Sequence, residues 1–540
     1  LNSSVDELII NLSKADANVQ IIQEGDLDLS SLNLNGGDVT INVEGNVSIG
    51  EFIGNAGNVT INATGSVSFS ADAGYTPAMV ERLQILAGGE VGGQIHTGNL
   101  SVQTEGSISL SNLGSGQMVV SRLDNGGADI ALTSEGDIRF DALMSLDGSS
   151  ELNLESDTGS LILNQDVASG SGAINLTAGG NLILNNSASI RSASGAFNLT
   201  SGSDLILGDA TLLDAGSGAF KLVSGGDMAL AQLVTESNVD LRISAVGAIA
   251  NVLERGTAIT AGAEATLVID AGAGIGSELA PLTTELGRLQ LLNSGSGAVS
   301  LLNTGGMIIE SIDQKDGDVS LETVGGAVVI EGDVSLERGD FVLYAGAPNS
   351  AILVEGNILT QGGDVTLTTE DGDVTFSGRV FVNGEGDISL QAPQGRILVD
   401  PAQSGWLRED GSFGELSDGS VSTEPFDSRI DWVIREGKLT TEIAGVSQVV
   451  VSEPGALATD ERIIDLSSLA PEPEDRGATY GLAVTIGDST QVFDYQANYS
   501  AALTGDEVLA DIASGLAQAI NSRAPDYMAA SDGAVIRLSG

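Results

Sequence analysis

The sequence predicts a mostly β protein, a right-handed parallel β-helix built from coils of about 20–23 residues and followed by a small α+β module. Three observations favour this fold. Residues 37–49 superpose on residues 57–69 with a constant offset of 20 residues. Within both copies apolar and polar residues alternate, which is the period of a strand with one buried face. One glycine, Gly45 or Gly65, interrupts each copy, so two short strands meet at a corner that requires a permissive backbone.

The N-terminal segment, residues 1–35, already shows the same alternation. Apolar and polar residues alternate in 8–12, 19–22 and 27–34. The open end of a stack of strands exposes unpaired backbone groups and needs a cover or a stacking neighbour. We therefore expect residues 1–35 to form a cap or the first coils.

Residues 36–400 are expected to form the β-helix itself, because the repeated phrase returns throughout this range. A unit of about 22 residues cannot bury its apolar face alone, so neighbouring coils must stack and pair in register. At ~22 residues a coil, this range accommodates roughly 16 or 17 coils at the strand spacing of a β-sheet. In the most regular copies the first apolar position recurs at nearly constant intervals, at Ile138, Leu161, Leu182, Leu205 and Met228.

Two other β architectures fit the repeat less well. An array of β-sandwiches would show about seven strands per ~100 residues without short-period self-similarity. A β-propeller predicts a period of about 40 residues and more aromatic residues than the 19 of this chain. The 20-residue offset therefore favours the β-helix.

Beyond Asp400 the sequence changes character. Residues 401–461 lose the periodicity and contain both tryptophans, Trp406 and Trp432, which indicates a capping or connecting β region. Residues 462–540 are predicted to form a small ββαβ module. Its strands are expected at 480–486, 491–495 and 534–538, and apolar residues at helical spacing predict a helix over 508–520.

Composition excludes several classes of function. The chain has no Cys and one His, so it has no disulfide, thiolate nucleophile, zinc finger or multi-histidine metal centre. Its 74 Asp and Glu against 21 Lys and Arg give a formal net charge of −53, which makes nucleic acid an improbable partner. No apolar stretch approaches the ~18 residues of a membrane-spanning helix. The excess of acid also suits a marine or halophilic setting.

Two phrases carry a family resemblance. Residues 55–69 (NAGNVTINATGSVSF) and 172–184 (GAINLTAGGNLIL) resemble the filamentous-haemagglutinin-like repeats of very large bacterial surface and secreted adhesins. The resemblance covers about residues 36–400 and implies an exported bacterial protein, although the family's amino-terminal secretion domain is not recognisable. Because the chain begins at Leu1 without Met, we expect it to be a segment of a longer polypeptide that continues beyond Gly540.

Parallel β-helices also occur among polysaccharide lyases and glycoside hydrolases, so catalysis is an alternative. Such enzymes need a basic residue for proton abstraction or a pair of carboxylates on one face. The sequence has only four Lys, and no Arg recurs at coil spacing to form a groove. We therefore expect no enzymatic activity and no catalytic residues.

Calcium binding fits the sequence better than catalysis does. Asp316 and Asp318 flank one glycine, and Glu370, Asp371 and Asp373 surround another, so hard oxygen ligands could converge there. Neither segment matches an EF-hand loop or a calcium-binding nonapeptide repeat. Calcium at these five residues is therefore one hypothesis, and ordinary Asp-Gly turns are the alternative.

The longest insertion, residues 71–97, contains His96, the single histidine. Apolar residues near helical spacing over 77–87 predict a short helix or an irregular projecting coil. This insertion is a candidate recognition element, whereas a lone histidine is rarely a ligand or a base.

These observations lead to one functional expectation. We expect a non-catalytic structural or adhesive segment of a giant exported bacterial protein, which forms a stiff acidic rod at the cell surface or in extracellular fibres. Its partners would be further copies of itself, or glycans and proteins outside the cell. The alternatives are a polysaccharide-binding or polysaccharide-processing β-helix, a self-assembling fibre or surface-layer subunit, and an acidic ion-binding matrix protein.

Overall fold

The structure is a computed structural model of the 540-residue chain, and it confirms the expected fold class. It describes residues 2–3, 7–11, 14–70, 79–186, 188–348, 350–376, 378, 380–383, 387–392 and 397–399, and beyond them the strands and the helix named below. It is mostly β, with 57% strand and 4% helix, and its parallel strands form a β-solenoid of about 16 turns. The chain divides into two compact units, Leu1–Glu285 and Leu286–Gly540.

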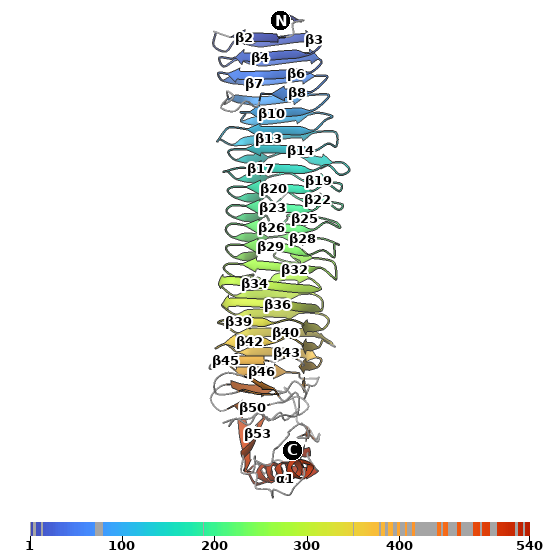
Figure 1. Cartoon of the computed structure of the whole chain (residues 1–540), viewed down its shortest axis with the longest axis vertical. Coiled ribbons are helices and arrows are strands. Elements are labelled where there is room, and N and C mark those ends of the chain that lie inside the picture. The colour runs from blue at the N-terminus through green and yellow to red at the C-terminus, as the bar shows by residue number, and fades with distance from the viewer. Residues whose placement is uncertain are drawn as a thin grey trace. The chain divides into compact units, whose positions relative to one another are not determined.

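In the first unit, successive coils contribute strands to three parallel ladders, which are stacked coil upon coil in Figure 1. The first ladder is β1 (Asn2–Ser3), β3 (Val19–Glu24), β5 (Val39–Glu44), β7 (Ala56–Ala63), β9 (Val80–Leu86), β11 (Asn99–Gln103), β13 (Met118–Asp124), β15 (Ile138–Phe140), β18 (Leu161–Leu163), β21 (Leu182–Leu184), β24 (Leu205–Leu207), β27 (Met228–Leu230) and β30 (Ile249–Asn251). The second is β2 (Glu7–Asn11), β4 (Leu27–Asn33), β6 (Val47–Ile53), β8 (Val67–Phe69), β10 (Val91–Ile95), β12 (Ile108–Asn112), β14 (Ile130–Ser134), β17 (Leu152–Ser156), β20 (Ile174–Ala178), β23 (Phe197–Ser201), β26 (Phe220–Ser224), β29 (Leu241–Ala245) and β32 (Thr266–Ala271). The third is β16 (Met144–Leu146), β19 (Val167–Ser169), β22 (Ile190–Ser192), β25 (Leu212–Asp214), β28 (Gln232–Val234), β31 (Ile259–Thr260) and β33 (Leu282–Glu285).

The register of these ladders is the one that the repeat predicts. Val39 lies opposite Val59, and Ile41 lies opposite Ile61, at the offset of 20 residues. The most regular copies also pair as expected, in the order Ile138, Leu161, Leu182, Leu205 and Met228. Each apolar residue therefore lies above its equivalent in the previous coil.

The inward face of each strand forms the core. Leu161, Leu182 and Leu205 have no exposed surface, and neither does Phe197. The ring of Phe197 packs edge-on against that of Phe220, with centroids 5.3 Å apart and an interplanar angle of 74°. Full burial of such a side chain contributes roughly 1.5–3 kcal/mol, so the hydrophobic effect holds every coil against its neighbours.

The second unit begins with further parallel coils. One ladder is β35 (Val299–Asn303), β37 (Val319–Thr323), β40 (Phe341–Pro348), β43 (Val365–Asp371), β46 (Asp387–Gln391) and β51 (Ser447–Val451), with β50 (Thr440–Ile443) antiparallel to β51. In the other, β34 (Arg288–Ser296) pairs with β36 (Met307–Asp316), and the long β36 pairs with two shorter strands. From there, one branch is β38 (Val328–Ile330), β41 (Ile352–Val354), β44 (Val374–Phe376) and β47 (Ile397–Val399), and the other is β39 (Val334–Leu336), β42 (Ile358–Gln361) and β45 (Val380–Asn383).

Between β47 and β50 in the sequence lies a small hairpin of β48 (Gly405–Leu407) and β49 (Phe413–Glu415). Trp406 belongs to β48, whereas Trp432 lies outside the described residues.

The C-terminal module contains the expected strands and helix with two additional strands. The hairpin is β53 (Thr479–Ile486) and β54 (Ser489–Gln496), and the helix α1 spans Gly505–Arg523. The expected last strand is β56 (Val535–Ser539), which pairs antiparallel with β52 (Arg462–Asp465) and β55 (Met528–Asp532). The ring of Tyr495 packs over Gly515, where an added Cβ would overlap a ring carbon.

The expectation of a helix or an irregular coil over residues 77–87 is wrong. This segment contains β9, which pairs in parallel with β7 and β11. In β9, Val80, Leu83 and Ile85 are buried, while the two residues between Val80 and Leu83 both face outward. This extra outward residue gives a spacing of three that imitates a helix. Residues 71–78 of the insertion lie outside the described residues.

Candidate functional site: the corner ladder

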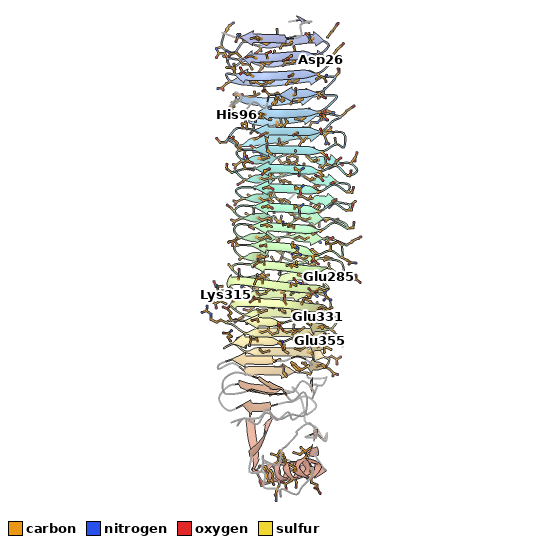
Figure 2. The ribbon with its side chains drawn as sticks, in the orientation of Figure 1. Asp26, His96, Glu285, Lys315, Glu331 and Glu355 are labelled. Carbon is orange, nitrogen blue, oxygen red and sulfur yellow. The ribbon has the colours of Figure 1, made fainter. Side chains whose placement is uncertain are left out.

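A ladder of Asp, Asn and Ser side chains follows the corners of the coils. One example is Asp26, a residue labelled in Figure 2, which directly precedes β4. Its Oδ1 accepts the backbone N–H of Asn46 in the next coil over 2.7 Å, and Oδ1 of Asn46 accepts the N–H of Ser66 over 2.9 Å. Each corner residue therefore binds the backbone of its own equivalent one coil further on.

Glycine before the corner residue makes room for this hydrogen bond. A Cβ added at Gly45 would lie 2.6 Å from Oδ1 of Asp26, which is closer than real Cβ contacts, and one added at Gly65 would overlap Oδ1 of Asn46. The recurring sequence of glycine, then a short polar residue, then an aliphatic residue is thus the local signature of the corner.

A second and longer run of the same kind lies at another corner, directly before strands of the first ladder from β15 to β30. Asp137 accepts the N–H of Ser160, and the same relation continues with donor–acceptor distances of 2.8–3.2 Å from coil to coil. The successive members are Asp137, Ser160, Asn181, Asp204, Asp227 and the N–H of Ala248. Because acidic and neutral side chains fill the same role, the role is hydrogen-bond acceptance rather than charge.

In the second unit, one run of this kind consists of three carboxylates. Oδ1 of Asp318 accepts the N–H of Asp340 over 3.0 Å, and Oδ1 of Asp340 accepts that of Asp364 over 2.8 Å. Three like charges thus occupy one corner of consecutive coils. Backbone N–H donation offsets part of their mutual repulsion, and dissolved cations screen the rest.

The five residues proposed for calcium lie at two separate turns, around Gly317 and Gly372. Asp318 is a member of the corner ladder, and Oδ2 of Asp316 lies 3.5 Å from Nη2 of Arg338. Glu370 and Asp371 end β43, and the backbone carbonyl of Asp373 accepts the N–H of Ile352 over 2.9 Å. In the described part of the chain, no three His, Cys, Asp or Glu side chains gather as a group that could hold a metal ion.

A second row of acids in the second unit is bridged by arginine. Glu310, Glu331 and Glu355 directly follow residues that pair in successive coils, and the latter two are labelled in Figure 2. The guanidinium of Arg288 forms ion pairs with Glu310 and Glu331, and its hydrogen bond to Glu310 is the main cause that raises the pKa of Arg288. Nε2 of Gln290 also donates to Oε2 of Glu310 over 2.6 Å. This network joins three successive coils.

His96 is part of a coil connection. Its backbone carbonyl accepts the N–H of Val80 over 2.8 Å, and a Cβ added at Gly114 would lie 2.6 Å from the imidazole Cδ2. The imidazole therefore lies against the backbone of the next coil. His96 is labelled in Figure 2.

The corner ladder was not predicted from the sequence. The available signal was the recurrence of Gly-Asp, Gly-Asn and Gly-Ser before an aliphatic residue, a pattern that is equally typical of turns and outward strand positions.

Comparisons with family models, with curated proteins and with solved structures found no match. The resemblance to filamentous-haemagglutinin-like repeats therefore stays a prediction from the sequence. Within the described residues, no helix is both long and apolar enough to cross a membrane.

Proposed function

We propose that this chain is a non-catalytic structural or adhesive segment of an exported bacterial protein, acting as a stiff, acidic spacer at the cell surface or in extracellular fibres. The observation that carries the proposal is the corner ladder. Its Asp and Asn side chains accept hydrogen bonds from backbone N–H groups of the next coil. Polar side chains on the surface therefore help to hold each coil against the next. A stack held in this way resists bending and extension.

The acidic exterior supports the same proposal. With a formal net charge of −53, copies of the chain repel one another at low ionic strength and remain soluble. Cations weaken that repulsion. Calcium at Asp316, Asp318, Glu370, Asp371 and Asp373 remains a prediction. Size-exclusion chromatography with light scattering, in EDTA and in millimolar calcium, tests it: a calcium-specific change of mass that magnesium does not reproduce supports the sites.

The cell-surface location and the structural or adhesive role are tested by separate experiments. In the bacterium that encodes the chain, antibodies against the first unit should label intact cells, and external protease should remove the label. Deletion of the coding region should reduce adhesion or fibre formation without loss of any extracellular polysaccharide-degrading activity. Label confined to permeabilised cells, or loss of such an activity, contradicts the proposal and favours the polysaccharide-processing alternative.

A further inference from the structure

One outward sheet face of the first unit carries no acid. Strands β20, β23, β26 and β29 pair in parallel and in register, and all four are labelled in Figure 1. Each strand has two outward positions between three buried ones. None of these outward positions is Asp or Glu, although the chain has 74 acidic residues. We call the outward side of these four strands the acid-free face.

The borders of this face consist mainly of stacked glycines. The chain reads Gly-Ala directly before β20, β23 and β26, and Gly-Gly or Gly-Ser directly after them. A Cβ added at Gly195 would overlap the carbonyl oxygen of Gly172, and one added at Gly202 would overlap that of Gly179. No side chain fits at these glycines, so the acid-free face is flat and lacks long side chains at its borders.

Two cations lie in register on the acid-free face. Lys221 of β26 lies opposite Arg242 of β29, and both residues are exposed. Like charges directly opposite one another on a sheet are destabilising, so this pair does not serve the fold. Nη2 of Arg242 lies 3.5 Å from Oδ2 of Asp240, in an ion pair whose side chains are 62% and 48% exposed. Lys221 forms no ion pair with any residue that the structure describes.

A ladder of amides leads up to these cations. Nδ2 of Asn198 donates to Oδ1 of Asn175 over 2.7 Å, and Nδ2 of Asn175 donates to Oδ1 of Asn153 over 2.6 Å. Asn198 in turn lies opposite Lys221. An amide has two N–H donors and two lone pairs, so the ladder orients Asn175 and leaves one donor and one lone pair of it for a ligand.

We infer that the acid-free face binds an anionic polysaccharide, with Lys221 and Arg242 facing its carboxylate or sulfate groups and Asn175 and Asn198 facing its hydroxyl groups. This inference rests on the adhesive role proposed above. Charge complementarity carries it, because two cations without acid on the surrounding strand positions attract an anion. A sugar residue of an extended chain advances by nearly the strand spacing of about 4.8 Å, so a polysaccharide along the stack meets one side chain of each ladder per coil.

The net charge of −53 makes this binding weak and dependent on salt. At physiological ionic strength the Debye length is about 8 Å, so exposed charges more than about two coils away are largely screened. The acids of the neighbouring corner, Asp204 and Asp227, lie beyond the glycine borders and accept backbone N–H groups. The cations on the face therefore dominate the field that a bound chain meets.

Gel electrophoresis through immobilised polysaccharide tests the inference on the full chain, with EDTA present so that calcium cannot bridge two acidic polymers. Alginate, dextran sulfate and neutral dextran are the three probes. Alginate or dextran sulfate should retard the native chain, and neutral dextran should not. Retardation by alginate alone assigns carboxylate as the ligand group, and retardation by dextran sulfate alone assigns sulfate. Equal behaviour in all three gels overturns the inference.

A pair of matched double variants tests the site. Lys221→Gln with Arg242→Gln should weaken anionic polysaccharide binding about tenfold. Arg122→Gln with Arg191→Gln changes the net charge equally, on strands of the first and third ladders, and should bind as the native chain does. Circular dichroism and urea midpoints check that all variants are folded. Equal losses in both double variants overturn the inference, because net charge rather than the face would then decide binding.

Light scattering without polysaccharide distinguishes the other occupant. The native chain should remain monomeric, whereas a concentration-dependent dimer that the Lys221 and Arg242 variant loses would assign the face to a second copy and overturn the inference. A chain that fails these tests and still labels intact cells keeps its spacer role, so the two proposals fail separately.

Discussion

Asp204 accepts a hydrogen bond from the backbone N–H of Asp227, one coil further on, over 2.9 Å. The two residues occupy the same corner, and Asp227 in turn accepts the N–H of Ala248. Acid next to acid would ordinarily destabilise a fold, yet here each carboxylate satisfies a backbone donor of the next coil. A strongly acidic surface and a regular solenoid are thus compatible because part of the acid is structural.

Removal of one corner acceptor should weaken one junction between coils. Asp204→Ala leaves the N–H of Asp227 to water and should lower the free energy of unfolding by roughly 0.5–1.5 kcal/mol. Asp204→Asn should restore most of it, because Asn181 already fills the same role. Hydrogen exchange of the Asp227 amide, followed by mass spectrometry, measures the local effect. Equal exchange rates in the Ala and Asn variants would refute the assignment.

Glycines differ sharply in what they tolerate. A Cβ added at Gly172 would overlap the carbonyl oxygen of Ser150, whereas one added at Gly116 meets nothing within 4 Å. We expect Gly172→Ala to lower the free energy of unfolding by about 1–3 kcal/mol, because the backbone at Ser150 must move to make room for the added Cβ. Gly116→Ala should be neutral or stabilising by up to about 1 kcal/mol, through the unfolded state. Urea denaturation of the two variants side by side measures the difference, and similar midpoints would contradict it.

The fold of the first unit was predictable because its register follows from period-two alternation. Once Val39 and Ile41 face inward, a slip of one residue would expose them, so the pairing with Val59 and Ile61 is the register that keeps both buried. The helix α1 was equally visible from apolar residues at helical spacing. Strand β55 was not, because its sequence, MAASD, lacks the β-branched and aromatic residues that mark strands.

The chemistry of the surface was harder to predict. The corner ladder depends on the distance between an Asx side chain and a backbone N–H of the next coil, which alternation alone does not give. The outward face of β18 was hidden for a related reason: in Leu161-Ile162-Leu163 all three residues are aliphatic, and only the coil decides that Ile162 faces outward. The helix prediction for the segment of β9 was wrong because its buried residues Val80 and Leu83 are three positions apart, as on one face of a helix.

The ion pair between Arg139 and Asp141 should make stability depend on acid pH. The hydrogen bond from Arg139 lowers the pKa of Asp141 below its ordinary value, against the opposing effect of burial, and Asn164 lowers it further. A carboxyl whose pKa is depressed by folding stabilises the native state above its unfolded pKa, and this contribution is lost as the pH falls through its folded pKa.

Arg139→Gln should therefore destabilise the chain at pH 7, by no more than about 1 kcal/mol because the pair is solvent-exposed. The difference from the native chain should shrink toward pH 3. Arg191→Gln removes the same charge from another coil and serves as the control. Urea midpoints at the two pH values measure both variants, and a difference that does not depend on pH would show that Arg139 acts through packing alone.

Tyr495 should titrate late and make the C-terminal module sensitive to alkali. Burial raises the pKa of Tyr495 to about 12, and the hydrogen bond of 2.8 Å from its hydroxyl to Oδ2 of Asp511 adds to the effect. Since the unfolded phenol loses its proton near pH 10, the contribution of this residue to stability is present below that pH and is lost as the pH rises toward about 12.

Absorbance at about 295 nm, where phenolate absorbs, follows the six tyrosines of the chain. Tyr495→Phe should remove the tyrosine that titrates at the highest pH. The free energy of unfolding of this variant should then fall less steeply above pH 10, the ordinary pKa of tyrosine. Asp511→Asn should keep part of the shift, because burial is its larger cause. If Tyr495→Phe instead removes a group that titrates with the others, Tyr495 is not buried against α1 in solution, and the packing of its ring over Gly515 is wrong.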